Sequence, residues 1–462
     1  MVTRRQEGAT DVANATERSP STVPGRANHD GETPGPYAWA EPTIWTPRMV
    51  QALQNGVKGG RWYSVIDKVL TLRSLEAAFA RVKANKGGVG VDHVTIDAFE
   101  RDKARHLTTL HESLRDGTYR PSPIRRCYIP KAGSKELRPL GVPTVRDRVV
   151  QTALRAALEP IFEREFADHS YGFRPQRSAK MALQRVDSLL RQGLTWVVDV
   201  DLKSYFDTVP HAPLMTLVKR RIADGRALDL IEAFLRQPIQ EEGRRWIPTV
   251  GTPQGAVVSP LLSNLYLDPL DHHMARMGFE MTRYADDFVI QCSTEEAARR
   301  ALEEVTRWCG DAGLTVHPTK TRLVQVSGTE GIDFLGYHFR LHRDDPWQTK
   351  RWPRKKSVAK LRDTLRPLTR RLIGISLGAV IGSVNRVLRG FFQYFRACIQ
   401  TSLAEIDRWV RGRLRSLLRK RRKGRGRARG LDMIRWPNAF FRTQGLFSLA
   451  GAHAEAAHSP RG

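Results

Sequence analysis

Two adjacent aspartates interrupt an apolar strand pattern in the segment Arg283–Ile290, and this feature limits the possible folds of the chain most strongly. Neighbouring side chains of a strand point to opposite faces of a sheet, so a straight strand would turn one carboxylate into the core. Burying an unpaired carboxylate is costly. A turn at Ala285–Asp286 avoids that cost and lifts both carboxylates to the tip of a hairpin. We therefore predict a tight hairpin over Met281–Cys292.

A second acidic cluster lies at the end of another apolar strand pattern and comprises Asp199, Asp201 and Asp207. If the two strands are neighbours, Asp201 joins Asp286 and Asp287 in a site of about three negative charges, which suits a pair of Mg²⁺ ions. Two ions ~3.5–4 Å apart can activate a primer 3′-hydroxyl and stabilise a leaving pyrophosphate. Asp199 and Asp207 are equally well explained as turn or helix-capping residues, and both interpretations stay open.

Positive charge is concentrated in one segment. The 462 residues carry a net charge of +28, and residues 351–430 hold 24 basic and 3 acidic side chains, a net +21. Within it, Arg411–Gly430 has eleven basic residues and no acid. A solvated helix face is the alternative, but a surface that binds a polyanion, most simply nucleic acid, explains the excess better. The candidate RNA-binding residues are Arg411, Arg413, Arg415, Arg419, Lys420, Arg421 and Arg422.

Composition excludes several other classes of protein. The four cysteines form no CxxC pair, which argues against a disulfide scaffold, a zinc ribbon or an iron–sulfur cluster and favours a reducing, cytoplasmic compartment. The most apolar run, Leu372–Val384, has 13 residues, three Gly and two Ser, whereas a membrane span needs ~20 apolar residues. We therefore expect no membrane association.

The periodicity along the chain predicts an α+β fold without repeats. Residues 1–43 are rich in Pro, Gly, Ser, Thr and Asn, which is typical of disorder. After about residue 350 we expect only helices, packed as a small basic three-helix bundle, and we expect Ile434–Ala457 to dock on a larger unit. The expected strands are Arg126–Pro130, Leu137–Val142, Leu194–Asp201, Leu314–Val316, Thr321–Val326 and Asp333–Leu341, and the expected late helices are Ser357–Leu372, Val380–Ile399 and Ser402–Lys423.

From about Pro47 onward the sequence resembles the group II intron-encoded reverse transcriptase/maturase family. The resemblance rests on many short blocks in the order that the family has them, which is far more specific than a single motif. The blocks are Lys86–Asp92, Ile129–Lys131, Arg138–Gly141, Tyr171–Pro175, Asp201–Asp207, Gly251–Gly255, Tyr284–Asp287, Gly313–Thr321, Phe334–Tyr337 and Arg435–Phe441.

The resemblance implies a right-hand polymerase followed by an all-α thumb. Fingers and palm would span residues 44–345, and a strongly basic helical thumb or maturase domain would span residues 346–430. The 1–43 segment would precede them, and a short tail would occupy residues 431–462. Because the tail has no Cys and only two His, we expect no HNH endonuclease there. Such a protein would need a nicked or replicating DNA strand as its primer.

The resemblance also implies the roles of the acidic residues. Asp201, Asp286 and Asp287 match the family's catalytic metal-binding triad, which would hold two Mg²⁺ ions. A backbone carbonyl from Val200 or Leu202 is a further candidate ligand, and the choice between them stays open.

Five residues match the family's nucleotide-binding positions. Lys131 and Arg138 would grip the triphosphate, because cations neutralise charge on the phosphates. Phe206 would block a nucleotide 2′-hydroxyl and so select dNTPs, Gln254 would line the pocket, and Lys320 would lie near the catalytic site. Purely structural roles remain as alternatives for these positions: an exposed turn lysine at Lys131, an ion pair at Arg138, a core ring at Phe206 and an ordinary turn at Gln254.

The function implied is RNA-directed DNA synthesis for intron mobility together with maturase binding of the intron RNA. The expected partners are group II intron RNA, target DNA and dNTPs in a bacterial cytoplasm, associated with the nucleoid, with dimerisation left open. Two alternatives stay: a maturase that only assists splicing, and a domesticated or defence reverse transcriptase. Loss of Asp286 would separate synthesis from RNA binding, and loss of thumb charge would weaken binding.

Overall fold

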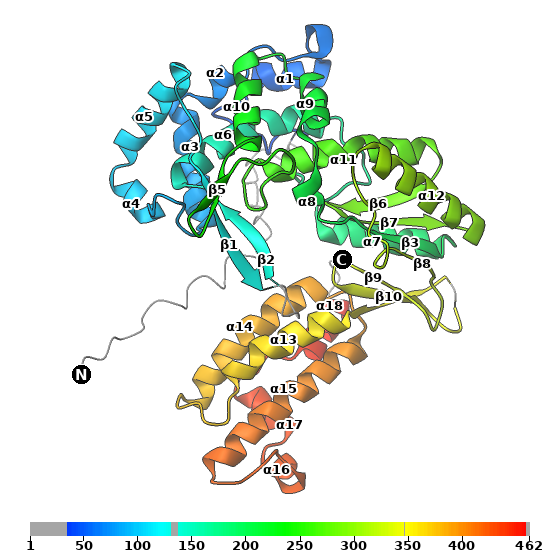
Figure 1. Cartoon of the computed structure of the whole chain (residues 1–462). Helices are drawn as coiled ribbons and strands as arrows, with labels where there is room; N and C mark the ends of the chain where they lie inside the picture. Colours follow the sequence, from blue (N-terminus) through cyan, green and yellow to red (C-terminus); the bar gives the residue numbers. More distant parts are fainter. Residues whose placement is uncertain (1–34, 131–136, 346, 459–462) are drawn as a thin grey trace.

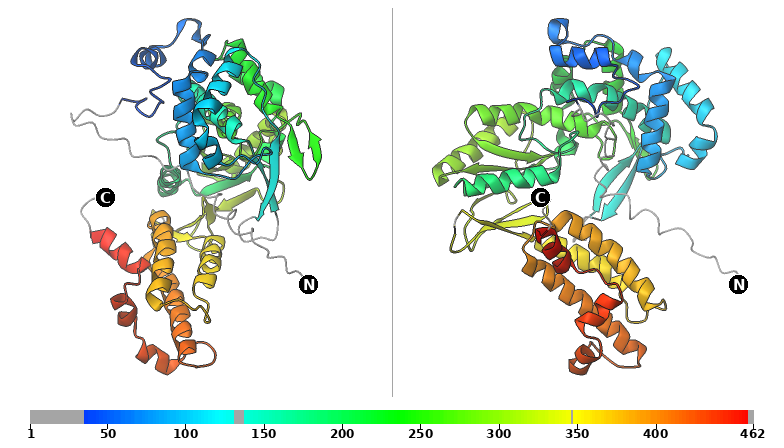
Figure 2. Two further views of the ribbon diagram at one scale, coloured as in Figure 1. Left: turned by 90° about the vertical axis from the view of Figure 1, so that its left-hand side faces the viewer. Right: turned by 180° about the vertical axis from the view of Figure 1, so that it is seen from behind.

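The computed structural model of the chain describes residues 35–130, 137–345 and 347–458. Figure 1 shows an upper region of helices and sheets and a helical bundle below it, joined by the strands β9 and β10. The two further views in Figure 2 show the same separation between the bundle and the upper region. This arrangement agrees with the α+β polymerase followed by a helical thumb that the sequence predicts.

The first helices build the fingers around one buried helix, α6 (Val145–Glu163). Thr144 caps it by accepting a hydrogen bond from the Asp147 backbone N–H, and most of its side chains are buried. α3 packs along it. The other elements of this region are α1 (Pro47–Asn55), η1 (Lys58–Gly60), α2 (Ile66–Val69), α3 (Leu72–Asn85), α4 (Ile96–Arg101), α5 (Lys103–Arg115), α8 (Tyr205–Thr208), α9 (His211–Lys219) and α10 (Gly225–Leu235).

A small mixed sheet extends from this helical region with the strand order β2-β1-β4-β5. The antiparallel pair β1 (Ile124–Pro130) and β2 (Leu137–Val142) confirms the predicted hairpin, whose residues 131–136 lie outside the described part. The sequence analysis missed β4 (Ile239–Glu241) and β5 (Arg244–Trp246), because three residues are too few for an alternating pattern to show.

The palm is an antiparallel sheet with the strand order β6-β7-β3-β8. Alternate residues of β3 enter different cores: Val198 packs in the cluster that holds α12, and Val197 packs in the cluster that holds α7. The predicted strand Leu314–Val316 is wrong, because this segment contributes only a single bridge from Val316 to Leu202. The elements are β3 (Trp196–Asp201), β6 (Glu280–Tyr284), β7 (Asp287–Cys292), β8 (Arg322–Gln325), α7 (Ala179–Arg191), α11 (Ser259–Arg276) and α12 (Glu295–Asp311).

A three-stranded antiparallel sheet leads from the palm to the bundle. It contains β9 (Ile332–Phe334), β10 (Tyr337–Leu341) and β11 (Thr349–Pro353). β11 corrects the expectation that strands end near residue 350. Tyr337 of β10 donates a hydrogen bond to the Tyr394 carbonyl in the last turn of α14 (Leu377–Phe395) and so joins this sheet to the helical bundle.

The thumb bundle consists of α13 (Lys355–Leu368), α14 (Leu377–Phe395) and α15 (Gln400–Arg421). The tail follows as α16 (Gly430–Arg435), α17 (Asn438–Thr443) and α18 (Leu449–His458). It packs on the bundle itself, since Phe441 and Leu449 share a core with Leu388 and Leu403. Asp407 of α15 caps α18 by accepting hydrogen bonds from the backbone N–H groups of Leu449 and Ala450.

The N-terminal expectation needs a correction. Residues 1–34 of the predicted disordered segment lie outside the described residues. Residues 35–43 form turns whose Trp39 and Ala40 pack on the fingers core, and Trp45 donates a hydrogen bond to the Ala156 carbonyl 2.9 Å away. Prolines and glycines gave this stretch a disordered composition, but its aromatic residues anchor it. Among the described helices, none has the length and apolar character that crossing a membrane requires.

Candidate active site

The carboxylates meet at the end of the palm sheet. Asp201, the last residue of β3, pairs directly with Asp287, the first residue of β7. Tyr284 of β6 also pairs with Asp287, so Ala285 and Asp286 form a two-residue hairpin loop. Ala285 has φ 60°, the positive value that tight hairpin loops demand at their first central residue. The structure thus confirms the predicted hairpin and places its two aspartates beside the second acidic strand end.

The proximity of these carboxylates changes their ionisation. Loss of hydration raises the pKa of Asp286, and the charge of Asp201 raises it further. Loss of hydration raises the pKa of Asp287 to about 7, with further contributions from Asp199 and Asp286. Asp287 still reaches solvent, so it is crowded by protein atoms without being sealed from water. The site therefore has an excess of negative charge that a cation would relieve.

Lys320 supplies one such cation. Its Nζ lies 3.1 Å from Asp201 Oδ2, and the Asp201 backbone N–H donates to Thr321 Oγ1 at 3.3 Å. The side chain of Lys320 is largely exposed, so the pair can open without unfolding anything around it. The sequence left open whether Asp199 belongs to the metal site or is a turn or capping residue. In the structure it forms an ion pair with Arg322, whose Nη2 lies 2.7 Å from Asp199 Oδ2.

A cavity of about 380 Å³ lies next to the short helix α8. Phe206 and Gln254 both line it, and Gln254 Nε2 donates to Asp207 Oδ2 at 3.3 Å. Arg138 is exposed on β2, whose residues Pro139 and Gly141 line the same cavity. Lys131 lies outside the described residues, and Lys320 lies with Asp201. Two of the predicted nucleotide contacts therefore share one cavity.

Sequence analysis did not assign three other residues of this cavity. Arg126 and Trp246 both line it and contact each other, with the Arg126 guanidinium over the Trp246 ring, 5.0 Å from its centroid. Asp207 was left as a possible turn residue. Its place in the Asp201–Asp207 block was the available signal for it, whereas nothing in the sequence near Trp246 indicates that β5 joins the fingers sheet.

The predicted RNA-binding residues differ in their surroundings. Arg415 is wrong as a surface contact: it is 3% exposed and donates to the Trp436 carbonyl and to Asn438 Oδ1, both at 2.8 Å. Arg415 lies on the side of α15 that packs against the bundle, so its side chain is buried together with the apolar residues of that side.

Two further arginines are committed to contacts inside the thumb. Arg413 donates to Thr369 Oγ1 at 3.1 Å, and Arg419 pairs with Asp432 at 2.7 Å. Arg411 is partly buried. Lys420, Arg421 and Arg422 are exposed at the end of α15, where Arg421 also donates to the Ile375 carbonyl, and all three stay predicted RNA contacts.

Two family models match the chain. The model for reverse transcriptase (RNA-dependent DNA polymerase) matches residues 129–339, and the model for the group II intron maturase-specific domain matches residues 358–433. The Escherichia coli protein YkfC is 35% identical over 312 residues, which make up 58% of this chain and 81% of YkfC. The chain belongs to the group II intron reverse transcriptase/maturase family. The predicted family, fold class and enzyme class are confirmed.

Other relatives of this reverse transcriptase/maturase align over smaller shares of their length. The group II intron-encoded protein LtrA of Lactococcus lactis is 39% identical over 208 residues, or 45% of this chain and 34% of LtrA. The putative COX1/OXI3 intron 2 protein of Saccharomyces cerevisiae is 34% identical over 340 residues, or 60% of this chain and 39% of that protein. The chain therefore spans only about a third of the length of LtrA.

Reverse transcriptases depend on divalent metal ions, and the donor chemistry of this site fits one. Carboxylates are the hard oxygen ligands that such ions prefer, and the charge of Asp201 raises the pKa of both Asp286 and Asp287. Within residues 35–130, 137–345 and 347–458, no three His, Cys, Asp or Glu side chains converge closely enough to surround an ion. Ligation by Val200 or Leu202 stays a prediction.

Proposed function

We propose that this chain is an RNA-directed DNA polymerase whose Asp201, Asp286 and Asp287 hold two Mg²⁺ ions. The observation that carries the proposal is the strand register that pairs Asp201 with Asp287 and puts Asp286 at the adjoining turn. When bound, such ions supply activation of the primer 3′-hydroxyl and neutralisation of the leaving pyrophosphate.

The protein's own side chains would orient the nucleotide. Phe206 and Gln254 line the cavity beside α8, so they would contact the sugar and the base pair being formed. Arg138 would reach the phosphates from β2, where an exposed guanidinium can bind them in a bidentate way. Lys320, whose largely exposed ammonium lies 3.1 Å from Asp201 Oδ2, would supply a positive charge for the phosphates.

Replacing Phe206 by Ala should reduce discrimination against ribonucleotides by up to about 10²-fold, because the space freed by the ring admits a 2′-hydroxyl. The measurement is the ratio of kcat/KM for dCTP to kcat/KM for CTP. Phe206→Tyr keeps the ring and should retain the discrimination. An unchanged ratio in Phe206→Ala would show that Phe206 belongs to the core and does not select the sugar.

Divalent-metal affinity should fall as the pH is lowered from 8 to 6. The pKa of Asp287 is raised to about 7 in the metal-free protein, so the carboxyl is ionised above that pH and becomes protonated below it. A protonated carboxyl cannot ligate, and each pH unit below 7 should weaken binding by up to about tenfold. Mn²⁺ titrations at several pH values measure this.

Asp199→Asn provides the matched test of that pH dependence. Asp199 contributes the largest charge effect on the pKa of Asp287, so removing its charge should move the transition to lower pH. Metal affinity that is the same at pH 6 and pH 8 would contradict the assignment of Asp287 as a ligand.

We further propose that the thumb binds group II intron RNA and assists its splicing, and that the same surface holds target DNA. The net +21 charge of residues 351–430 supports this second role. Such a surface also favours association with the nucleoid. A splicing-only maturase would share this thumb but would not extend a primer.

Primer extension by the full chain on an RNA template tests the proposed polymerase. We expect a DNA product complementary to the template that requires dNTPs and Mg²⁺ and disappears with EDTA. A folded protein that binds RNA and adds no nucleotide would contradict polymerase activity and leave the splicing-only maturase.

A further inference from the structure

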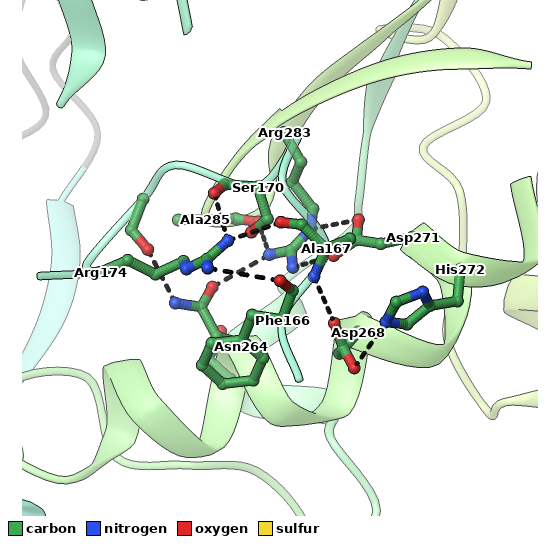
Figure 3. A network of polar contacts seen from close by, with 12 residues as sticks. Phe166, Ala167, Ser170, Arg174, Asn264, Asp268, Asp271, His272, Arg283 and Ala285 are labelled. Atoms are coloured by element: carbon green, nitrogen blue, oxygen red, sulfur yellow. Dashed lines mark hydrogen bonds and ion pairs between the residues drawn. The ribbon is translucent and has the colours of Figure 1, made fainter. Parts of the chain in front are cut away.

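The hairpin loop that carries Asp286 rests on a fully buried arginine. Arg283 in β6 is 0% exposed, and so is its partner Asp271 in α11. Arg283 Nε lies 2.8 Å from Asp271 Oδ1 and 3.0 Å from Oδ2, and Nη2 also donates to Oδ2. Figure 3 shows the guanidinium held between Asp271 and Asn264. The pair is bidentate, so the plane of the guanidinium has a fixed direction.

One donor of Arg283 is directed at the loop itself. Nη1 donates to the Ala285 carbonyl at 2.9 Å and to Asn264 Oδ1 at 3.0 Å. Ala285 immediately precedes Asp286 and has φ 60°, a left-handed conformation that residues with a Cβ disfavour. Such a conformation persists only where the surroundings hold it, and the hydrogen bond from Arg283 is a restraint of that kind.

The segment His169–Gly172 encloses the loop from the other side. The Arg283 backbone N–H donates to the His169 carbonyl at 2.9 Å, and the Tyr171 N–H donates to the Arg283 carbonyl at 2.8 Å. Gly172 lies so close that a Cβ on it would be 2.2 Å from the Ala285 nitrogen. Asn264 Nδ2 donates to the Gly172 carbonyl at 2.7 Å, so Asn264 links Arg283 to this segment.

A nearby arginine shows what a purely structural pair looks like. Arg174 is buried and paired with Glu163 at 2.9 Å, and it donates to the carbonyls of Ala167 and Ser170, both outside the loop. Arg283 differs because its guanidinium contacts the residue next to a metal-binding candidate. Losing Arg283 would remove a direct hydrogen bond to the loop, whereas losing Arg174 would act on the loop only indirectly, through Ser170 in the enclosing segment His169–Gly172.

We propose that Arg283 is a positioning residue that sets the direction of Asp286 and Asp287 toward the divalent metal. The proposal rests on the proposed polymerase function but concerns metal binding, so it can be tested without turnover. Partners that orient metal ligands typically change affinity or activity by about 10–100-fold when they are lost. Lysine keeps the charge of Arg283 but cannot make the planar set of contacts to Asp271, Asn264 and Ala285.

The experiment measures Mn²⁺ binding by electron paramagnetic resonance and Mg²⁺-dependent primer extension in the full chain. Arg283→Lys should bind Mn²⁺ about tenfold more weakly and lower kcat by about 10–100-fold, with the KM for dNTP unchanged. Asn264→Ala should move both quantities in the same direction by a smaller factor. Asp224→Ala is the control: Asp224 is 7% exposed, caps α10 and accepts hydrogen bonds from the Val65 and Ile66 backbone N–H groups among the fingers helices, so it should lower the Tm and leave Mn²⁺ affinity unchanged.

The outcomes separate this proposal from the polymerase function. A folded Arg283→Lys protein with wild-type Mn²⁺ affinity would overturn the positioning role, as would a wild type that binds no Mn²⁺. If Arg283→Lys does not fold, unchanged affinity in Asn264→Ala overturns it and weakened affinity supports it. A wild type that binds Mn²⁺ and loses affinity in Arg283→Lys, yet extends no primer, would support positioning and refute polymerase activity.

Discussion

Asp286→Asn should reduce primer extension by at least about 10³-fold and leave the affinity for RNA unchanged. Asparagine has nearly the same shape as aspartate, so the hairpin loop at Ala285–Asp286 should keep its conformation. What is lost is the negative charge that a divalent ion requires beside Asp201 and Asp287. Single-turnover extension with saturating primer, RNA template and dNTPs measures the loss, and filter binding of RNA measures the control property.

Asp199→Asn is the matched control for this substitution. Asp199 lies on β3 two residues before Asp201, and Arg322 pairs with it 2.7 Å away. Asp199 is a nearby carboxylate that is not one of the proposed metal ligands. Asp199→Asn should therefore change the extension rate by only a few-fold at pH 8. Equal losses in both variants would mean that general negative charge, and not a metal-binding triad, governs the reaction.

Neutralising four exposed basic residues of the thumb should weaken RNA binding strongly. We propose the fourfold variant Lys420→Gln, Arg422→Gln, Arg425→Gln and Arg427→Gln, whose four side chains are all exposed. Each phosphate contact releases counterions, so the slope of log affinity against log salt should become less steep by about 3, and affinity at 0.1 M salt should drop at least about tenfold. Extension on a tightly annealed short primer–template should change less than the affinity for long RNA.

A basic set on the palm provides the control for thumb charge. Arg276, Arg299, Arg300 and Arg307 are exposed on α11 and α12. Changing these four to Gln removes the same amount of positive charge as the thumb variant does. The palm surface differs because it has no long run of basic residues free of acidic ones, as Arg411–Gly430 is. RNA affinity and salt slope should stay close to wild type. If both fourfold variants lose affinity equally, net charge and not the thumb surface determines binding.

The core of the active site could be predicted from sequence because its constraints are local. Two adjacent aspartates in an apolar strand allow few conformations, and a two-residue loop between Tyr284 and Asp287 satisfies them. The neighbouring position of β3 required one further assumption, that the two acidic strand ends share a site. The register of Asp201 against Asp287 agrees with it.

Features that depend on long-range packing could not be predicted. Arg283 and Arg415 look like surface charges in a sequence, yet both are buried. A residue from another element makes this possible: the Asp271 carboxylate neutralises Arg283, and the Trp436 carbonyl accepts a hydrogen bond from Arg415. Basic residues occur on every side of α15 within Arg411–Gly430, so the sequence did not indicate which of them face the bundle. Trp39 and Ala40 likewise pack on a core formed by residues far along the chain.

The central claim is that Asp201, Asp286 and Asp287 hold the divalent ions that make this chain an RNA-directed DNA polymerase. The most direct test measures Mn²⁺ occupancy and RNA-templated extension in the same samples of wild type and Asp286→Asn at pH 8. We expect extension by the wild type to rise with Mn²⁺ occupancy, and we expect Asp286→Asn to lose both together while it still binds RNA. Extension that persists in Asp286→Asn, or a folded wild type that binds RNA and extends nothing, would contradict the claim.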